Sequence, residues 1–255
     1  MSATPRLFVT HDLLQGAQIP MTDEQGNYLL RVLRLGEGAA LRLFNGRDGE
    51  WTAALHPEGK RAAVAVLGQQ MRAQPAHVTD LELWFAPVKK ARTDFIVEKA
   101  TELGVHRIRP VLTGRTHSER VRIDRFEKIA LEAAEQTERL DLPVIEDPLR
   151  LEDALQRIEP NRSLYFCDEA GDDGSAPWGG KAGRAPPFAL ALAGAAPGPA
   201  AILIGPEGGF TPDERAALRG HAQVHPVGLG PRILRAETAV AAALAVWQSQ
   251  VGDWR

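Results

Sequence analysis

The chain has 255 residues, 44% hydrophobic and 25% charged, which is typical of a folded protein with one large or two modest domains. Its net charge of −3 excludes the uniformly basic class of nucleic-acid-binding proteins. The single cysteine, Cys167, excludes an internal disulfide and a cysteine-rich metal cluster. We therefore expect a reducing compartment, the cytoplasm, and no metal.

The charges are unevenly distributed. Residues 1–122 carry 17 basic and 13 acidic side chains, whereas residues 123–255 carry 13 and 20. A basic excess in one half is typical of a surface that faces a polyanion, although an ordinary solvated surface explains it equally well. We find no run of about 18 apolar residues, so no membrane span is expected, and residues 1–10 lack a signal-peptide layout.

The first part of the chain has the pattern of a small β domain. Short apolar runs predict strands over 39–44, 50–55 and 61–67, with a turn at 45–49. The polar stretch 68–77 is interpreted as a linker. We therefore expect one domain over residues 1–75 and a second over residues 76–255.

The second part alternates between strand and helix patterns, which predicts an α/β domain with a mainly parallel sheet. We expect Thr93 to be the N-cap of a helix that ends before Gly104, and a longer helix over 122–140. The segment 171–187 is rich in Gly, Pro and Asp and predicts a mobile loop. The remaining expected elements are strands over 81–86, 105–112, 164–167, 201–204 and 224–227 and a helix over 236–247.

Two Gly-rich loops, each after an apolar run, are the most informative motifs. The first, Gly205 to Phe210, precedes a helix start with Thr211 as N-cap, Pro212 at N1 and Glu214 at N3. The second, Val227 to Arg235, precedes an Ala-rich helix. Loops at the carboxyl ends of strands bind ligands in open α/β sheets, and glycine lets a ligand approach the backbone. A simple strand-to-helix connection is the alternative for each loop taken alone.

Several other nucleotide-binding and catalytic motifs are absent from the sequence. The chain has no GxxxxGK[ST] and no GxSxG, and its seven histidines show no metal-ligand spacing. Gly36-Glu37-Gly38 lacks the third glycine of a dinucleotide-binding loop.

The combination of motifs resembles one known family. GPEGGF at 205–210 with LGPRILRAETA at 229–239 is similar to the signature of SPOUT-class methyltransferases, and within it to the RsmE family of 16S ribosomal RNA uridine-N3 methyltransferases. KATELGV at 99–105 agrees, as do Glu135-Gln136 with Arg139 and Pro143, and Arg31 to Arg34 with Gly36 and Gly38. Asn27 departs from the family, which often has histidine there, and this puts one RNA contact in doubt.

The resemblance implies a SPOUT trefoil-knot methyltransferase domain, an N-terminal PUA-like β-barrel domain and a homodimer. It implies S-adenosylmethionine as methyl donor and, as substrate, N3 of the uridine at position 1498 in 16S rRNA of the small ribosomal subunit. The expected donor contacts are Ile204, Gly205, Pro206, Glu207 and Gly208 in the first loop and Leu229, Gly230, Ile233 and Leu234 in the second.

Uridine N3 carries a proton that must leave, so the site needs a base or a group that stabilises the anion. Arg235 is the candidate for stabilising the anion, with Arg139, from the partner in a dimer, as the second. Glu237 or Glu135 is the candidate base, and an ion pair with an arginine is the structural alternative for either. The expected RNA contacts are Arg6, Arg31, Arg34, Lys89, Lys90, Arg92 and Arg115.

Two other functions remain open from the sequence. A non-catalytic RNA-binding or ribosome-assembly factor on the same fold would explain the basic residues, although it has no need of the Gly-rich loops. A SPOUT methyltransferase that acts on another RNA, such as transfer RNA, would share the donor site. The pattern Arg31 to Gly38 favours the ribosomal substrate.

Overall fold

The computed structural model describes residues 4–76, 79–116, 121–169 and 185–254. The chain forms two compact units, each assembled from two stretches of sequence. The first unit comprises residues 1–77 and 134–142, and the second comprises residues 78–133 and 143–255. The predicted mobile loop at 171–187 lies outside the described residues up to residue 184.

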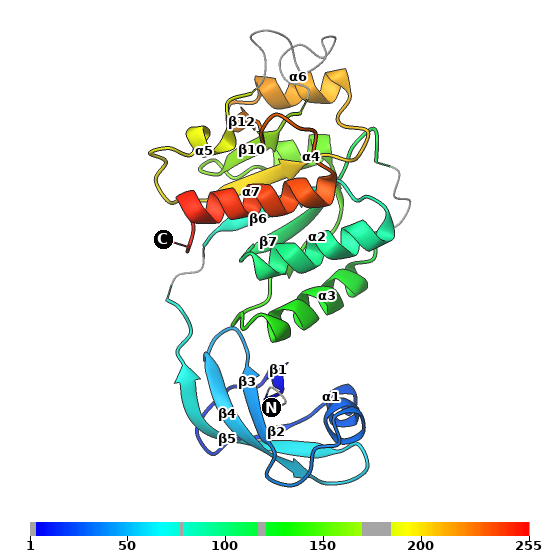
Figure 1. The fold of residues 1–255 in the computed structure, drawn as a ribbon, viewed down its shortest axis with the longest axis vertical. Helices are drawn as coiled ribbons and strands as arrows, with labels where there is room; N and C mark the ends of the chain where they lie inside the picture. The colour runs from blue at the N-terminus through cyan, green and yellow to red at the C-terminus, as the bar shows by residue number, and fades with distance from the viewer. Residues whose placement is uncertain (1–3, 77–78, 117–120, 170–184, 255) are drawn as a thin grey trace. The chain divides into compact units, whose positions relative to one another are not determined.

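The first unit is a curled five-stranded sheet with the order β1-β3-β4-β5-β2 (Figure 1). β1 and β3 pair in parallel, and the other neighbours are antiparallel. The predicted strands are confirmed as β3, β4 and β5, but the linker expected from residue 68 is wrong in its first part because β5 continues to Arg72. The strands are β1 Arg6–Phe8, β2 Gln18–Pro20, β3 Ala40–Phe44, β4 Glu50–Pro57 and β5 Ala63–Arg72.

A short helix, α1 Asp23–Asn27, leads into the π-helical turn η1 Tyr28–Val32. Thr22 and Gln25 form a capping box at the start of α1. A Cβ atom on Gly26 would lie 1.8 Å from the carbonyl oxygen of Arg61, so only glycine lets α1 pack this closely.

The second unit has a parallel sheet with the order β12-β10-β11-β6-β7-β8, and β9 also pairs with β7. This confirms the α/β domain with a parallel sheet. β6 and β11 are buried along their whole length, as strands covered on both faces must be. The strands are β6 Leu81–Phe85, β7 Arg107–Leu112, β8 Val144–Ile145, β9 Leu149–Arg150, β10 Ser163–Cys167, β11 Ala200–Ile204 and β12 Val224–Val227.

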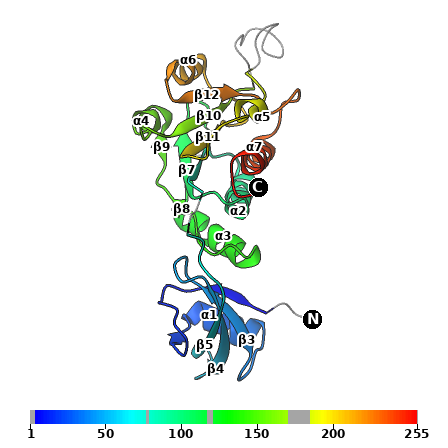
Figure 2. The same cartoon turned by 90° about the vertical axis from the view of Figure 1, so that its left-hand side faces the viewer.

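Helices cover both faces of this sheet (Figure 2). Leu83 and Phe85 point into one apolar layer with side chains of α2 Lys90–Glu102, α3 Ile123–Gln136, α5 Phe188–Ala191 and α7 Ala236–Gln250. Trp84, between them in sequence, points into the other layer with α4 Leu151–Gln156 and α6 Pro212–Gly220. The alternation follows from the two-residue period of a strand.

Two predicted helix boundaries are wrong. α2 begins at Lys90 rather than after Thr93, because the Thr93 hydroxyl is buried and bonded to the backbone of Val88. α3 ends at Gln136 rather than at 140, and Glu138 has a positive φ of 61°. The last residues of α3, from Ala134, belong to the first unit, and within that unit Arg6 donates to the carbonyl oxygen of Ala134.

Candidate functional site

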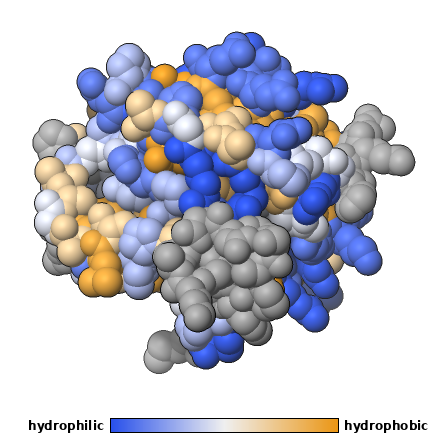
Figure 3. Space-filling view, turned by 90° about the horizontal axis from the view of Figure 1, so that it is seen from above, coloured by the Kyte–Doolittle hydropathy of each residue, from blue (hydrophilic) through white to orange (hydrophobic). Residues whose placement is uncertain are grey.

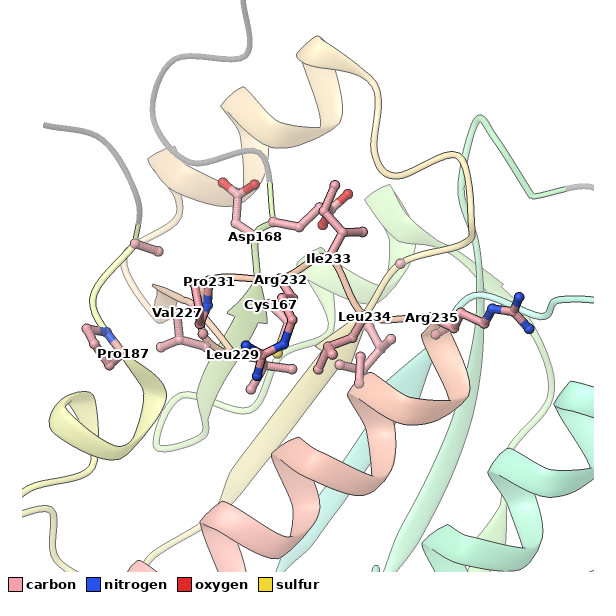
Figure 4. A pocket seen from close by; sticks show the side chains of 18 of the residues that line it. Cys167, Asp168, Pro187, Val227, Leu229, Pro231, Arg232, Ile233, Leu234 and Arg235 are labelled. Carbon is pink, nitrogen blue, oxygen red and sulfur yellow. The ribbon is translucent and has the colours of Figure 1, made fainter. Parts of the chain in front are cut away.

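A cavity of about 590 Å³ lies in the second unit, at the carboxyl ends of three neighbouring strands, β11, β10 and β12 (Figure 4). The loop after each strand contributes to its wall, and the start of α7 closes it from below with Ala236 and Ala239. The carboxyl edge of a parallel sheet is the place where the backbone is free to turn around a ligand. The two Gly-rich loops therefore share one cavity, as the sequence indicated.

The first loop makes a tight bend after β11. A Cβ atom on Gly205 would lie 2.5 Å from the ring of Phe210, which is itself buried against Phe166. Gly209 has a φ of +64°, a conformation that favours glycine. The predicted capping box of Thr211 and Glu214 is confirmed and fixes where the loop gives way to α6.

The second loop leaves β12 at Gly228, which pairs with the backbone on either side of Pro187. The apolar residues Leu229, Ile233 and Leu234 all line the cavity, and Ile233 is also 71% exposed. Figure 3 shows apolar surface among hydrophilic side chains at this end of the second unit. The loop thus offers an apolar wall to a flat ligand.

The loop after β10 is the part of the site that the sequence analysis missed. Cys167, Asp168 and Glu169 line the cavity, because β10 lies between β11 and β12. In the sequence these three residues stand at the end of the predicted strand 164–167, a position where ligand-binding loops begin. Only the order of the strands in the sheet shows that this end lies beside the Gly-rich loops. Pro186, Pro187 and Ala239 also line the cavity and were not predicted. Val227, Gly228, Pro231 and Arg232 belong to the predicted second loop and line the cavity as well, but they were not named as donor contacts.

Acidic groups at the β10 end differ in their partners. Asp168 is buried and forms ion pairs with Arg215 and Arg219 of α6. Partial desolvation raises the pKa of Glu169, and the neighbouring Asp168 acts in the same direction. Burial also raises the pKa of the Cys167 thiol, which therefore stays protonated near neutral pH.

The predicted donor-binding residues lie together around the cavity. All of them line it except Gly208, whose carbonyl oxygen accepts a hydrogen bond from Arg115. The structure therefore places the predicted residues of both loops around one cavity. Their contact with a methyl donor stays a prediction.

The three predicted catalytic residues are placed differently. Arg235 lines the cavity through its position at the start of α7, and its guanidinium points away from the other labelled side chains (Figure 4). Glu237 does not line the cavity, and its Oε1 lies 3.5 Å from the Nε of Arg92. Arg139 belongs to the first unit and pairs with Asp141. Glu135, the alternative base, also belongs to the first unit, where it accepts a hydrogen bond from the backbone N–H of Phe8.

The predicted RNA contacts fall into three groups. Arg31, Arg34, Lys89 and Lys90 are exposed and remain candidates. Arg92 is half-buried and Arg115 is exposed, and both contact the first Gly-rich loop, through Glu207 and Gly208 respectively.

Arg6 does not have the expected position on the surface. It is buried, and it donates to Glu50 and to the carbonyl oxygens of Ala134 and Arg139. We therefore assign Arg6 a structural role and leave it out of the RNA surface.

The described residues contain no group of three or more His, Cys, Asp or Glu side chains placed to hold a metal ion. Across the same part of the chain, no helix is both long and apolar enough to cross a membrane.

Comparison with known proteins identifies the family. Residues 74–248 match the RNA methyltransferase domain family, and residues 21–68 match the RNA methyltransferase PUA domain family. The chain is 32% identical to ribosomal RNA small subunit methyltransferase E of Rickettsia conorii, over 94% of this chain and 93% of that protein. The Synechocystis protein of the same name is 32% identical over 94% of this chain and 76% of its own length.

A solved structure agrees over the whole length. The Neisseria gonorrhoeae ribosomal RNA small subunit methyltransferase E, bound to S-adenosylmethionine, superposes with a TM-score of 0.81 at 27% identity. The match covers 99% of this chain and all of the other. The expected fold class, a SPOUT methyltransferase domain with an N-terminal PUA-like domain, is thereby confirmed. The chain belongs to the ribosomal RNA small subunit methyltransferase E family of RNA methyltransferases.

Proposed function

We propose that this protein transfers a methyl group from S-adenosylmethionine to N3 of a uridine in 16S ribosomal RNA, the one at position 1498. The observation that carries the proposal is a cavity lined by both Gly-rich loops at the carboxyl ends of β11 and β12. Family membership supports both the donor and the class of RNA.

The cavity has the size and chemistry that this donor needs. Its volume of about 590 Å³ falls within the range of roughly 300–1,000 Å³ found for small-molecule sites. Leu229 and Leu234 supply apolar contacts for an adenine ring, and the Gly-rich backbone supplies N–H and C=O groups for its polar edge. We propose that Ile204, Gly205, Pro206, Glu207, Leu229, Gly230, Ile233 and Leu234 hold the donor.

The chemistry depends mainly on positioning. When bound, S-adenosylmethionine would supply a methyl group on a sulfonium sulfur, which leaves as a neutral thioether, so no activating metal is required. The rigid strand ends hold the loops at a fixed spacing, and orienting two reactants in this way contributes up to roughly 7–11 kcal/mol.

The acceptor requires charge stabilisation. Removing the N3 proton leaves negative charge on the uracil oxygens, and a cation beside them lowers the cost of that step. We propose that Arg235 provides this cation, because it stands at the rim of the cavity and its side chain is exposed. We leave Arg139 and Glu237 as secondary candidates, since neither lines the cavity.

We propose that the RNA is held by exposed cations in both parts of the chain. Arg31 and Arg34 flank the exposed apolar side chain of Val32 on η1, which suits contact with phosphates and an unstacked base. Lys89 and Lys90, at the start of α2 in the second unit, are the other exposed cations that we propose to contact RNA. In this proposal residues 1–75 form the RNA-binding domain and residues 76–255 form the methyltransferase domain.

We further propose a homodimer in the cytoplasm, where its ribosomal substrate is assembled. The resemblance of the sequence to the family supports the dimer, and light scattering coupled to size-exclusion chromatography tests it. A mass of about one chain, 27.7 kDa, would contradict it.

The activity is tested with small ribosomal subunits from cells that lack this methyltransferase. Purified protein and labelled donor are expected to methylate one uridine at N3, identified by mass spectrometry of the nucleosides. Donor binding without methylation of any RNA would favour a non-catalytic assembly factor. Methylation of transfer RNA in place of the subunit would favour a different substrate.

A further inference from the structure

Arg92 stands between the two Gly-rich loops of the second unit. Its Nη1 lies 3.0 Å from the Oε1 of Glu207, and its Nε lies 3.5 Å from the Oε1 of Glu237. Glu207 belongs to the first loop and lines the cavity. Glu237 lies in the first turn of α7, directly after the second loop. One guanidinium therefore contacts a carboxylate attached to each loop.

Arg92 is itself held by a rigid element. It lies in the first turn of α2, where the Thr93 hydroxyl is bonded to both backbone groups of Val88. Ile96 and Ala100 of the same helix are fully buried in the core. A side chain on such a helix fixes the position of its partners better than one on a loop.

The two glutamates depend on this cation. The Oε2 of Glu237 is buried and has no hydrogen-bond partner among the residues that the structure describes. Both carboxylates lie close to the same guanidinium, and without that cation the two negative charges would repel each other. Removing Arg92 would therefore drive Glu207 and Glu237 apart and with them the two loops.

The first loop is braced on its other side as well. Arg115, which follows β7, donates from Nη1 to the carbonyl oxygen of Gly208 at 2.7 Å. The residues Glu207 and Gly208 are thus each held by an arginine from outside the loop, although neither arginine lines the cavity. This arrangement fits a role in shaping the donor site better than a role in contacting RNA.

We propose that Arg92 is a positioning residue for the methyl donor: it fastens Glu207 of the first loop to Glu237 of α7 and keeps both loops at the spacing that the donor requires. We call Arg92 with its two contacts, to Glu207 and to Glu237, the Arg92 latch. The latch rests on the proposed function and adds to it a residue outside the donor pocket. It also replaces the expectation that Arg92 binds RNA.

The test measures donor affinity by titration calorimetry on the full chain. Arg92→Ala is expected to weaken binding of S-adenosylmethionine by at least about fivefold, as coupled contacts of this kind do. The matched control is Arg125→Ala. Arg125 lies on α3 and pairs with Asp94 of α2, the helix that carries Arg92, but it contacts neither loop. The control is expected to change the Kd by less than about twofold.

A second measurement separates positioning from general destabilisation. In a Glu207→Ala background, Arg92→Ala is expected to add less than about twofold, because the two residues act through one contact. Arg92→Lys is expected to restore part of the affinity, since an ammonium keeps the charge but cannot span both carboxylates as the fork does. Should the alanine variant fold poorly, Arg92→Gln replaces it as a polar side chain that is shorter and uncharged, and it is expected to weaken donor binding in the same way.

The outcomes are distinct. If the wild-type protein binds no donor, the proposed function fails and the latch fails with it. If the wild type binds donor and Arg92→Ala binds it equally well, only the latch is overturned. A variant that keeps donor affinity but loses RNA affinity, with a shallower salt dependence, would return Arg92 to the RNA surface.

Discussion

Gly205 has no room for a side chain at the bend where β11 ends. The nearest atom to an added Cβ belongs to Phe210, a ring that is 4% exposed and packs edge to face on Phe166. Gly205→Ala is therefore expected to lower the free energy of unfolding by about 1–3 kcal/mol through overpacking, and to weaken donor binding. Urea unfolding and calorimetry check both effects. Gly220→Ala, where the added Cβ meets nothing within 4 Å, is the control.

Arg235 has a chemical rather than a packing role in the proposed mechanism. Its side chain is exposed and makes no capping bond to α7, so its loss leaves the cavity wall in place. Arg235→Ala is expected to reduce kcat for methylation far more than it weakens donor binding. Equal losses of donor affinity and turnover would show that this arginine is structural.

The raised pKa of Glu169 is expected to make the stability of the protein depend on pH. Desolvation raises its folded-state pKa above the ordinary value of 4.5, so the protonated form is the one that folding favours. Its stabilising contribution is present below that ordinary value and is lost as pH rises through the raised pKa. Glu169→Gln is expected to match the wild type in thermal stability near pH 4 and to exceed it near pH 8. A stability difference that is independent of pH would contradict this.

At the scale of elements, the helix after the first loop is fixed by side chains at its start. Thr211 Oγ1 accepts from the backbone of Glu214, and the Glu214 carboxylate accepts from the backbone of Thr211. Thr211→Ala is expected to lower the free energy of unfolding by about 1 kcal/mol. Thr211→Ser, which keeps the hydroxyl, is the control in the same thermal scan, and a loss as large as that of alanine would exclude the cap as the cause.

The elements that the sequence predicted share a strong local signal. Strands such as β11 are continuous apolar runs, and Thr211 with Pro212 and Glu214 is a helix start that needs no tertiary partner. β1 and β8 are too short to show a period, so they form only because a neighbouring strand is present. The N-cap expected at Thr93 was wrong because its buried hydroxyl bonds to the backbone of Val88, earlier in the chain, inside a helix that has already begun at Lys90.

At the scale of the whole molecule, Arg6 joins segments that are remote in sequence. Within the first unit it pairs with Glu50 of β4 and donates to the carbonyl oxygens of Ala134 and Arg139, more than a hundred residues away. Both side chains of the pair are almost fully buried.

Arg6→Ala is therefore expected to lower the free energy of unfolding by roughly 3 kcal/mol, because Glu50 keeps a buried charge with less compensation. Arg47→Ala, which breaks an exposed pair with Asp12, is the control and is expected to cost less than about 1 kcal/mol. Similar losses for the two variants in urea unfolding would contradict the structural role of Arg6.

The sequence by itself determined the family, the parallel α/β domain and the two loops, because each depends on local features: apolar strands, glycines at bends and a helix cap. Only the tertiary structure decided which arginines contact other groups of the protein. Arg6, Arg92 and Arg115 have the same side chain as Arg31, and their roles differ because a guanidinium takes its function from the groups that folding places around it. The position of Cys167, Asp168 and Glu169 beside the loops likewise follows from strand order, a property of the sheet that no local pattern encodes.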